Sequence, residues 1–498
     1  MKLSLVKRFT IDKILLVLVL VVVVRSFWSL LFYNFVTDDF FYLFISKFNG
    51  IGDFLNFFSF SHSDSSGYIF YRPLTTQVYY GIIHKLLGLS PFYYHFLNLF
   101  LHLVNTCLVF YLALLIFPKS KFFALIAALF FGLNASQTIA IAWAGNFQEI
   151  GATFFILLSI IFLYRGICER KNFMMILSFV FFVFSLMSKE MAMVFPFIGL
   201  LLIMIFGRRR DLVKIVPFFA VLLIYSFFHF VKYPFRQSEA YTFLIDTQAI
   251  NTLRWYIWWA LGFPEPFINY IGNNFKILPE VWVSFLREAV VSFSLFVLLN
   301  LLILSGIFLI IRDNFKKILD AKFLFFIIFY IIFLMPVLFL PQNKYAYHQS
   351  TALVGFALAL AMLLKKVIET KNRFSKFIVG ATIGIFIALS IFSIDFTIKN
   401  SFVLLRAKIV EKVLGNFQRE FPSLSEGSIV YIKNDPNYEY KIESWGASAR
   451  QAYYALNGEY AFKVFYGDSV KVYYEGVRDL PDGVDFARVV EFVADLKL

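Results

Sequence analysis

Cysteine and charge are both scarce in this sequence. Two of the 498 residues are cysteines, Cys107 and Cys168, and their spacing fits neither a zinc site nor a disulfide framework. Charged residues make up 16% of the chain, compared with about 25% in an average soluble domain. The sequence also contains no repeat of about 34 residues, the period of tetratricopeptide (TPR) helical repeats. These absences exclude a disulfide-rich scaffold, a soluble enzyme with a charged surface and a TPR array.

Apolar and aromatic residues are abundant instead. The chain is 60% hydrophobic and 20% aromatic, with 68 phenylalanines, and its mean hydropathy is +0.75. This composition predicts a polytopic α-helical membrane protein. The first apolar run, Ile14–Tyr33, is longer than the core of a cleavable signal peptide, which spans about 7–15 residues. We therefore expect an uncleaved signal anchor, in which Arg25 needs a partner or a snorkelling route. Four basic residues precede the run: Lys2, Lys7, Arg8 and Lys13.

Ten further apolar runs approach or reach the length of a membrane span, which predicts about eleven transmembrane helices. They are Phe92–Phe117, Phe122–Ala142, Phe147–Tyr164, Phe173–Met187, Met191–Phe206, Ile215–Val231, Ala289–Ile311, Phe323–Leu340, Ser350–Leu364 and Phe377–Ile394. Residues 1–396 are thus expected to form a transmembrane domain.

Lysine and arginine are distributed unevenly between the predicted loops. With a cytoplasmic N-terminus, the short inner loops carry 22 of these residues, and the longer outer loops carry ten. This follows the positive-inside rule. Because topology accounts for the net charge of +14, no nucleic-acid partner is needed. The sequence thus predicts an integral multi-pass protein, and its compact loops and cysteine-free C-terminal part favour a prokaryotic plasma membrane. The first loop (37–91), a large loop (232–288) and the C-terminal part would be extracytoplasmic.

Residues 397–498 have the composition of a soluble domain. They contain 13 Lys and Arg residues and 14 Asp and Glu residues. Apolar residues at every fourth position from Leu405 to Phe421 predict an amphipathic helix that ends before Pro422. We expect a small extracytoplasmic α/β domain without a catalytic motif. Its other predicted elements are a helix over Ala447–Leu456 and strands over Ser428–Ile432, Tyr460–Tyr466, Val470–Tyr474 and Val489–Val493.

Two adjacent carboxylates, Asp38 and Asp39, follow the first span directly. Ionisable groups at the edge of the hydrocarbon are costly, so such residues are candidates for function. Two like charges side by side raise each other's pKa, which suits a shared proton, a divalent metal ion or acid–base chemistry. The alternative is that the pair only caps and anchors the end of the span.

Other polar residues lie at the predicted outer ends of the spans. Arg72, held by Pro73, presents a guanidinium that matches phosphate bidentately; the alternative is a positioning charge at the lipid headgroups. Glu149 and Glu190 both begin spans, and Glu190 beside Lys189 fits a neutralised pair at a helix N-terminus.

A polar stripe lies within the second span. Its members recur at spacings of three, four and three, so they share one helix face. They are His95, Asn98, His102 and Asn105. We favour interhelical hydrogen bonding over metal binding, because zinc would need further carboxylate or thiol ligands nearby.

An extracytoplasmic site has no supply of nucleotide sugars or ATP, so a group donor must arrive on a lipid. Glycosyl transfer from a polyprenyl-phosphate sugar fits an outer carboxylate and an outer arginine. The acceptor hydroxyl needs a general base. The leaving phosphate needs cationic stabilisation. One base and direct displacement at the anomeric carbon predict inversion.

Several short segments, taken in order, resemble the GT-C superfamily of membrane glycosyltransferases. Within it, they resemble the protein-O-mannosyltransferase-like branch, which comprises glycosyltransferase family 39 and the transmembrane-and-TPR O-mannosyltransferases. The resemblance covers about Lys13 to Leu364. The segments are Thr37-Asp38-Asp39, Tyr71-Arg72-Pro73-Leu74, Tyr94 to Asn105, Ala140-Ile141-Ala142-Trp143, Ser188-Lys189-Glu190 and Lys344-Tyr345-Ala346-Tyr347.

The resemblance implies a role for each matched residue. Asp38 would be the general base, with Asp39 assisting it or holding a divalent metal ion, and the two roles could be exchanged. Arg72 would hold the lipid phosphate. The other implied substrate-binding residues are Tyr71 and His95, Lys189 and Glu190 in a turn that shapes the cavity, and Lys344 and Tyr345 against the donor.

The implied activity is inverting transfer of a sugar from a polyprenyl-phosphate donor to a hydroxyl, as in mannosyltransferases. The acceptor would be a protein Ser or Thr, a lipid or a cell-envelope glycan. The missing TPR repeats count against a protein acceptor. Two other classes stay open: a lipid or solute transporter or flippase, and an envelope assembly scaffold without catalysis. Internal repeats and mid-membrane polar groups would favour a transporter.

Overall fold

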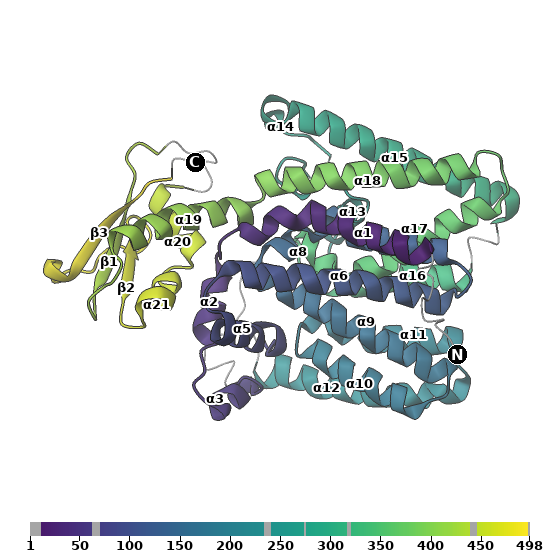
Figure 1. Cartoon of the computed structure of the whole chain (residues 1–498), viewed down its shortest axis with the longest axis horizontal. Helices are drawn as coiled ribbons and strands as arrows, with labels where there is room; N and C mark the ends of the chain where they lie inside the picture. Colours follow the sequence, from purple (N-terminus) through teal and green to yellow (C-terminus); the bar gives the residue numbers. More distant parts are fainter. Residues whose placement is uncertain are drawn as a thin grey trace, which may run out of the picture.

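The computed structural model shows a helical body with a small domain attached at one end (Figure 1). It describes residues 11–61, 70–233, 241–272, 275–315, 320–438 and 446–496. The N-terminal basic residues Lys2, Lys7 and Arg8 therefore lie outside the described residues, as do parts of both predicted outer loops.

The helical body spans residues 11 to 400 in the described part of the chain. Its α-helices are α1 (Ile11–Phe27), α2 (Asp38–Ile45), α3 (Ile51–Asn56), α5 (Tyr79–Leu87), α6 (Pro91–Ile116), α7 (Lys121–Gly132), α8 (Thr138–Ala142), α9 (Phe147–Cys168), α10 (Asn172–Leu186), α11 (Phe195–Phe206), α12 (Val216–Ser226), α13 (Gln248–Ala260), α14 (Pro279–Ser284), α15 (Leu286–Asn314), α16 (Ala321–Leu338), α17 (Ala352–Glu369) and α18 (Ser375–Asn400).

All eleven predicted apolar runs are helical, but not all of them have the length and composition of a span. Among the described residues seven helices do, and an eighth is counted if α7 and the segment Ala135–Ala142, bent by 44° relative to each other, are taken as one span. The runs at Phe173–Met187 and Met191–Phe206 give helices too short to count. The run at Ser350–Leu364 becomes α17, which is almost wholly buried between other helices. The prediction of a multi-pass helical protein is confirmed, with fewer full spans than eleven.

The C-terminal domain is a three-stranded parallel sheet with helices. Strand β1 (Ile429–Asn434) lies between β2 (Lys471–Tyr474) and β3 (Val489–Ala494). The helices α19 (Phe402–Glu420) and α20 (Ser448–Leu456) form where they are predicted. The α/β prediction is thereby confirmed.

One predicted strand of this domain is wrong. Tyr460–Tyr466 forms helix α21. Its aromatic composition favours a strand, but tertiary packing overrides that preference. Phe462 is buried against Phe417 of α19, with the ring centroids 5.0 Å apart, while Tyr460 packs 5.0 Å from Phe41 of α2. In a strand, side chains two positions apart point to the same face, whereas in helix α21 Tyr460 faces α2 and Phe462 faces α19.

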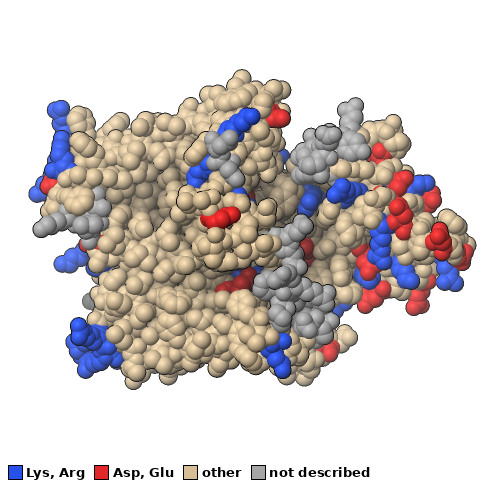
Figure 2. Space-filling model, turned by 180° about the vertical axis from the view of Figure 1, so that it is seen from behind, with Lys and Arg blue, Asp and Glu red and all other residues tan. Residues whose placement is uncertain are grey.

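Basic side chains gather at one end of the helical body. At the end away from the C-terminal domain, the Lys322 ammonium lies over the Phe117 and Phe206 rings, and Lys365 also lies over Phe117. Basic residues of separate predicted inner loops therefore gather at one end. Figure 2 shows this end marked by blue side chains, the C-terminal domain with both colours, and mostly tan surface between them. Helices α2 and α5 lie at the opposite end, next to the C-terminal domain (Figure 1).

Candidate active site

A cavity of about 800 Å³ lies at the end of the helical body that meets the C-terminal domain. Segments far apart in the sequence contribute its polar lining, including Asp38, Arg72, Lys189, His348 and Asn457. Apolar side chains make up much of the remaining wall, among them Met193, Phe230, Phe243, Met335, Val337, Phe339 and Leu340. The cavity therefore presents both a polar region and an apolar surface to one ligand.

The two adjacent aspartates have different environments. Asp39 is fully buried. Its Oδ1 accepts hydrogen bonds from the Tyr80 hydroxyl at 2.5 Å and the Gly145 N–H at 2.7 Å, and its Oδ2 accepts one from the Val36 N–H at 2.9 Å. Asp38 instead lines the cavity, where its side chain is accessible although protein surrounds its carboxyl group. Asp38 is thus the carboxylate available to a substrate, and Asp39 holds the end of the first span to α5 and the α9 region.

That the two aspartates hold a divalent metal ion stays a prediction, for which the Asp39 carboxylate has little free lone-pair capacity. Three of the roughly four lone-pair positions of the Asp39 carboxylate already face N–H or O–H donors. Among the described residues, no three His, Cys, Asp or Glu side chains are grouped to hold a metal ion.

Burial shifts the pKa of both carboxyl groups upward. For Asp38, burial raises the pKa, and the positive charges of Arg406 and Arg72 oppose the shift. For Asp39, burial raises the pKa to about 7, against the opposing hydrogen bonds from Tyr80, Val36 and Gly145. An Asp38 carboxylate with a raised pKa is a better proton acceptor than an ordinary exposed aspartate.

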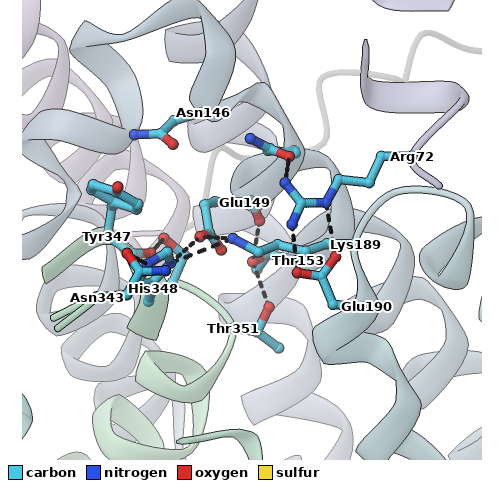
Figure 3. A network of polar contacts seen from close by, with 12 residues as sticks. Arg72, Asn146, Glu149, Thr153, Lys189, Glu190, Asn343, Tyr347, His348 and Thr351 are labelled. Atoms are coloured by element: carbon cyan, nitrogen blue, oxygen red, sulfur yellow. Dashed lines mark hydrogen bonds and ion pairs between the residues drawn. The ribbon is translucent and has the colours of Figure 1, made fainter. Parts of the chain in front are cut away.

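Arg72 makes a forked ion pair inside the cavity wall (Figure 3). Its Nε donates to Glu190 Oε2 at 2.8 Å and its Nη2 to Glu190 Oε1 at 2.5 Å, while Nη1 bonds to the Gln148 side chain. The guanidinium also lies 4.0 Å from the centroid of the Phe70 ring. The Arg72 plane is therefore fixed in position, as recognition of a planar or tetrahedral anion requires.

A second charged group lies beside the first. Lys189 forms an ion pair with buried Glu149, and His348 Nδ1 lies 2.8 Å from the same Glu149 oxygen (Figure 3). Burial lowers the pKa of His348, and the neighbouring Lys189 lowers it further, against the opposing effect of Glu149. The two cations, Arg72 and Lys189, are balanced by Glu149 and Glu190.

Local backbone contacts bring the two cations together. The Leu74 N–H donates to the Met187 carbonyl at 3.2 Å, and the Thr75 hydroxyl donates to the Ser188 carbonyl at 2.7 Å. Gly151 of α9 lets this loop approach, since a Cβ there would lie 2.7 Å from the Thr75 methyl group. The segment that carries Arg72 is therefore held directly against the segment that carries Lys189.

Four predicted substrate-binding residues do not line the large cavity. The Tyr71 hydroxyl donates to the Phe58 carbonyl, and its ring stacks on Phe60. His95 Nε2 lies 3.1 Å from the Tyr33 carbonyl oxygen. Lys344 and Tyr345 line a separate cavity of about 220 Å³.

The polar stripe of α6 bonds to neighbouring backbone, as predicted. Asn98 donates to the carbonyl of Trp143, His102 contacts that of Gly132, and Asn105 donates to that of Ile150. The stripe therefore joins helices together and takes no part in the cavity.

The sequence interpretation missed His348, and it noted Glu149 only as the start of a span. No local motif marks the histidine, because its relation to Glu149 arises across 199 residues of sequence. The only signal is its position, directly after the Lys344 to Tyr347 segment.

Asp39→Asn should destabilise the protein, because an amide cannot accept all three bonds. If the amide oxygen takes the place of Oδ1, the NH₂ group faces the Val36 N–H donor. We expect a loss of about 1–3 kcal/mol, seen as a lower midpoint of thermal unfolding in detergent. Asp38→Asn, at a position without such bonds, is the control and should leave the midpoint nearly unchanged. Equal midpoints for the two variants would contradict the structural role of Asp39.

No protein-family model matches the chain, and no curated protein matches it. Two solved structures are similar to it over most of their length, both of ArnT from Cupriavidus metallidurans. The crystal structure bound to undecaprenyl phosphate shares 12% identity, with 93% of this chain and 86% of that chain covered and a TM-score of 0.44. The apo structure shares 14% identity, with 84% and 81% covered and a TM-score of 0.41. Neither likeness is close enough to establish a family.

Proposed function

We propose that this chain is an inverting membrane glycosyltransferase of the GT-C type. It would move a sugar from a polyprenyl-phosphate donor to an acceptor hydroxyl on the extracytoplasmic side of the membrane. The observation that carries the proposal is the single cavity shared by Asp38 and the Arg72–Lys189 cluster. This reaction needs a general base and a group that binds phosphate, and the candidates for both line the same cavity.

In the proposed reaction, Asp38 removes the proton from the acceptor hydroxyl as that oxygen attacks the anomeric carbon of the donor. The bond between this carbon and the phosphate oxygen breaks, and the polyprenyl phosphate leaves with the bonding electrons. Direct displacement inverts the anomeric configuration. The acceptor becomes the glycoside, and the proton stays on Asp38 until solvent removes it.

The leaving phosphate gains negative charge, which Arg72 and Lys189 are placed to stabilise. Because both cations are already paired with Glu190 and Glu149, their donors are held in position before the lipid arrives. The apolar wall formed by Phe230, Phe243 and Met335 with its neighbours suits the first isoprene units of the donor. A cavity with a polar region and an apolar wall thus matches a donor with a charged phosphate and an apolar chain.

Label transfer tests the proposal directly. Membranes that contain the protein are incubated with radiolabelled polyprenyl-phosphate sugars, and protein, lipid and glycan fractions are then separated. Because the motifs resemble the O-mannosyltransferase branch, the mannose donor is the first to test. We expect label to leave the lipid and appear in one fraction, and not in membranes without the protein. Donor that crosses the bilayer without losing its sugar would instead indicate a flippase.

The side of the membrane is tested separately. Single cysteines are placed at exposed Asn437 in the C-terminal domain and at Lys371 after α17, in a chain that lacks Cys107 and Cys168. A membrane-impermeant maleimide added to intact cells should label position 437 and leave 371 unlabelled. The reverse pattern would place the cavity on the cytosolic side and overturn the proposed donor.

A further inference from the structure

The C-terminal domain contacts the first loop at the candidate base itself. The Thr37 N–H donates to the Ala455 carbonyl at 2.8 Å, and the Asn457 amide Nδ2 donates to Asp38 Oδ1 at 3.5 Å. Ala455 lies in the last turn of α20, and Asn457 is the residue that ends this helix. The partners of these contacts are far apart in the sequence: Asp38 and Asn457 are separated by 419 positions.

Backbone conformation makes the contact specific. Thr37 has a φ of 50°, which is rare for a β-branched residue, and such a conformation persists only where the surroundings hold it. Asn457 lies in the left-handed region with a φ of 52°, followed by Gly458 at 62°. Asparagine and glycine tolerate this region. The left-handed end of α20 thus contacts the strained backbone of Thr37, and Asp38 is the next residue in the chain.

The C-terminal domain also forms one wall of the cavity. Asn457 and Tyr460 both line it. The Tyr460 ring lies 5.0 Å from Phe41 and 5.4 Å from Phe44, so it packs on the same short helix, α2, that begins at Asp38. An ion pair between Lys47 and Asp468 joins the same two parts of the chain farther out.

We propose that the C-terminal domain is part of the catalytic site, where the Ala455 carbonyl fixes the Thr37–Asp38 turn and Asn457 positions the Asp38 carboxylate. Tyr460 then forms the side of the cavity from which the acceptor hydroxyl approaches. Asn457 is a positioning residue, because it acts on the acceptor through Asp38. The inference rests on the proposed function and adds a role for the domain in which no catalytic motif is found.

The other groups near Asp38 come from several elements. Asp39 adjoins Asp38 in α2, and Arg72 lies across the cavity. Arg406 belongs to α19. The Tyr345 phenol also interacts electrostatically with Asp38. Two of the favourable neighbours of the carboxylate, Arg406 and Asn457, thus belong to the C-terminal part of the chain. Removal of the uncharged Asn457 carboxamide should therefore alter the ionisation of Asp38 and leave donor binding unchanged.

Two substitutions at one position test this inference. Asn457→Gly removes the carboxamide and keeps the left-handed backbone, whereas Asn457→Asp keeps the shape and places a second negative charge beside Asp38. The rate of label transfer is measured against pH and against donor concentration. We expect kcat to fall severalfold in Asn457→Gly, because the contact that positions the Asp38 carboxylate is lost. The acidic limb of the pH profile should move to higher pH, and farther in Asn457→Asp, with donor KM unchanged in Asn457→Gly.

Asn437→Gly, an exposed substitution of the same kind in the same domain, is the matched control and should behave as wild type. The inference is overturned if the wild-type protein transfers sugar but neither Asn457 variant moves the acidic limb. A fall in rate with an unmoved pH profile would also overturn it, since loss of folded protein alone produces that pattern. A wild-type protein that transfers no sugar overturns the proposed function instead, so the two failures are distinguishable.

Discussion

Asp38→Asn should lower the rate of sugar transfer by about 10²- to 10⁴-fold, the contribution typical of a general base. The amide has the shape of the carboxylate but cannot take the proton of the acceptor hydroxyl. Because Asp38 lines the cavity and holds no internal hydrogen-bond network comparable to that of Asp39, the variant should remain folded. The measurement is initial label transfer at saturating donor, with thermal unfolding of the same preparation.

The pH dependence of the wild-type protein provides an independent check on the base. Transfer needs the deprotonated carboxylate, so activity should be lost as the pH falls through the pKa of Asp38. Burial raises this pKa, so the loss should occur above the ordinary aspartate range. Asp38→Asn should retain a residual rate without this acidic limb.

Asp53→Asn, at an exposed position of the same loop, is the matched control and should transfer sugar at the wild-type rate. If Asp38→Asn keeps more than about a tenth of the wild-type rate, the base is another group. Asp39 would not be the natural replacement, because its oxygens already face donors on three sides.

The sequence alone could locate the acid pair but could not assign different roles to its two members. Asp38 and Asp39 are identical in type, and local pattern places both just beyond the first span. What separates them is the positive-φ backbone of Thr37 and the hydrogen-bond donors of Asp39, which are Tyr80 and Gly145. These donors lie 41 and 106 residues from Asp39 in the sequence. Such partners follow from tertiary structure, which a single sequence does not show.

The charge cluster shows the same limit. The positions of Arg72, Lys189 and Glu190 at one end of the spans could be predicted from hydropathy and charge. Adjacent Lys189 and Glu190 invite the interpretation of a mutual pair, yet each forms its ion pair with a more distant residue, Glu149 and Arg72 respectively. The crossed pairing depends on how two loops pack, and only the structure reveals it.

Arg72→Ala should weaken donor binding by about two orders of magnitude or more, as expected when one member of a buried charge pair is removed. The four charged side chains Arg72, Lys189, Glu149 and Glu190 balance one another. Removing Arg72 leaves the cavity with an excess negative charge at the proposed phosphate site. The attraction of the cavity for the phosphate is then lost. The measurement is the Kd of a fluorescent polyprenyl phosphate in detergent.

Two further variants separate the role of Arg72 in binding from its role in folding. Arg72→Lys keeps the charge but loses the planar fork, so its donor affinity should fall between those of wild type and Arg72→Ala. Glu190→Gln breaks the same ion pair from the other side, yet it gives the cavity an excess positive charge. Donor affinity should therefore be retained or increased in Glu190→Gln, even if its unfolding midpoint falls. If Glu190→Gln and Arg72→Ala weaken the donor equally, the pair serves only to hold the two loops together, and the phosphate binds elsewhere.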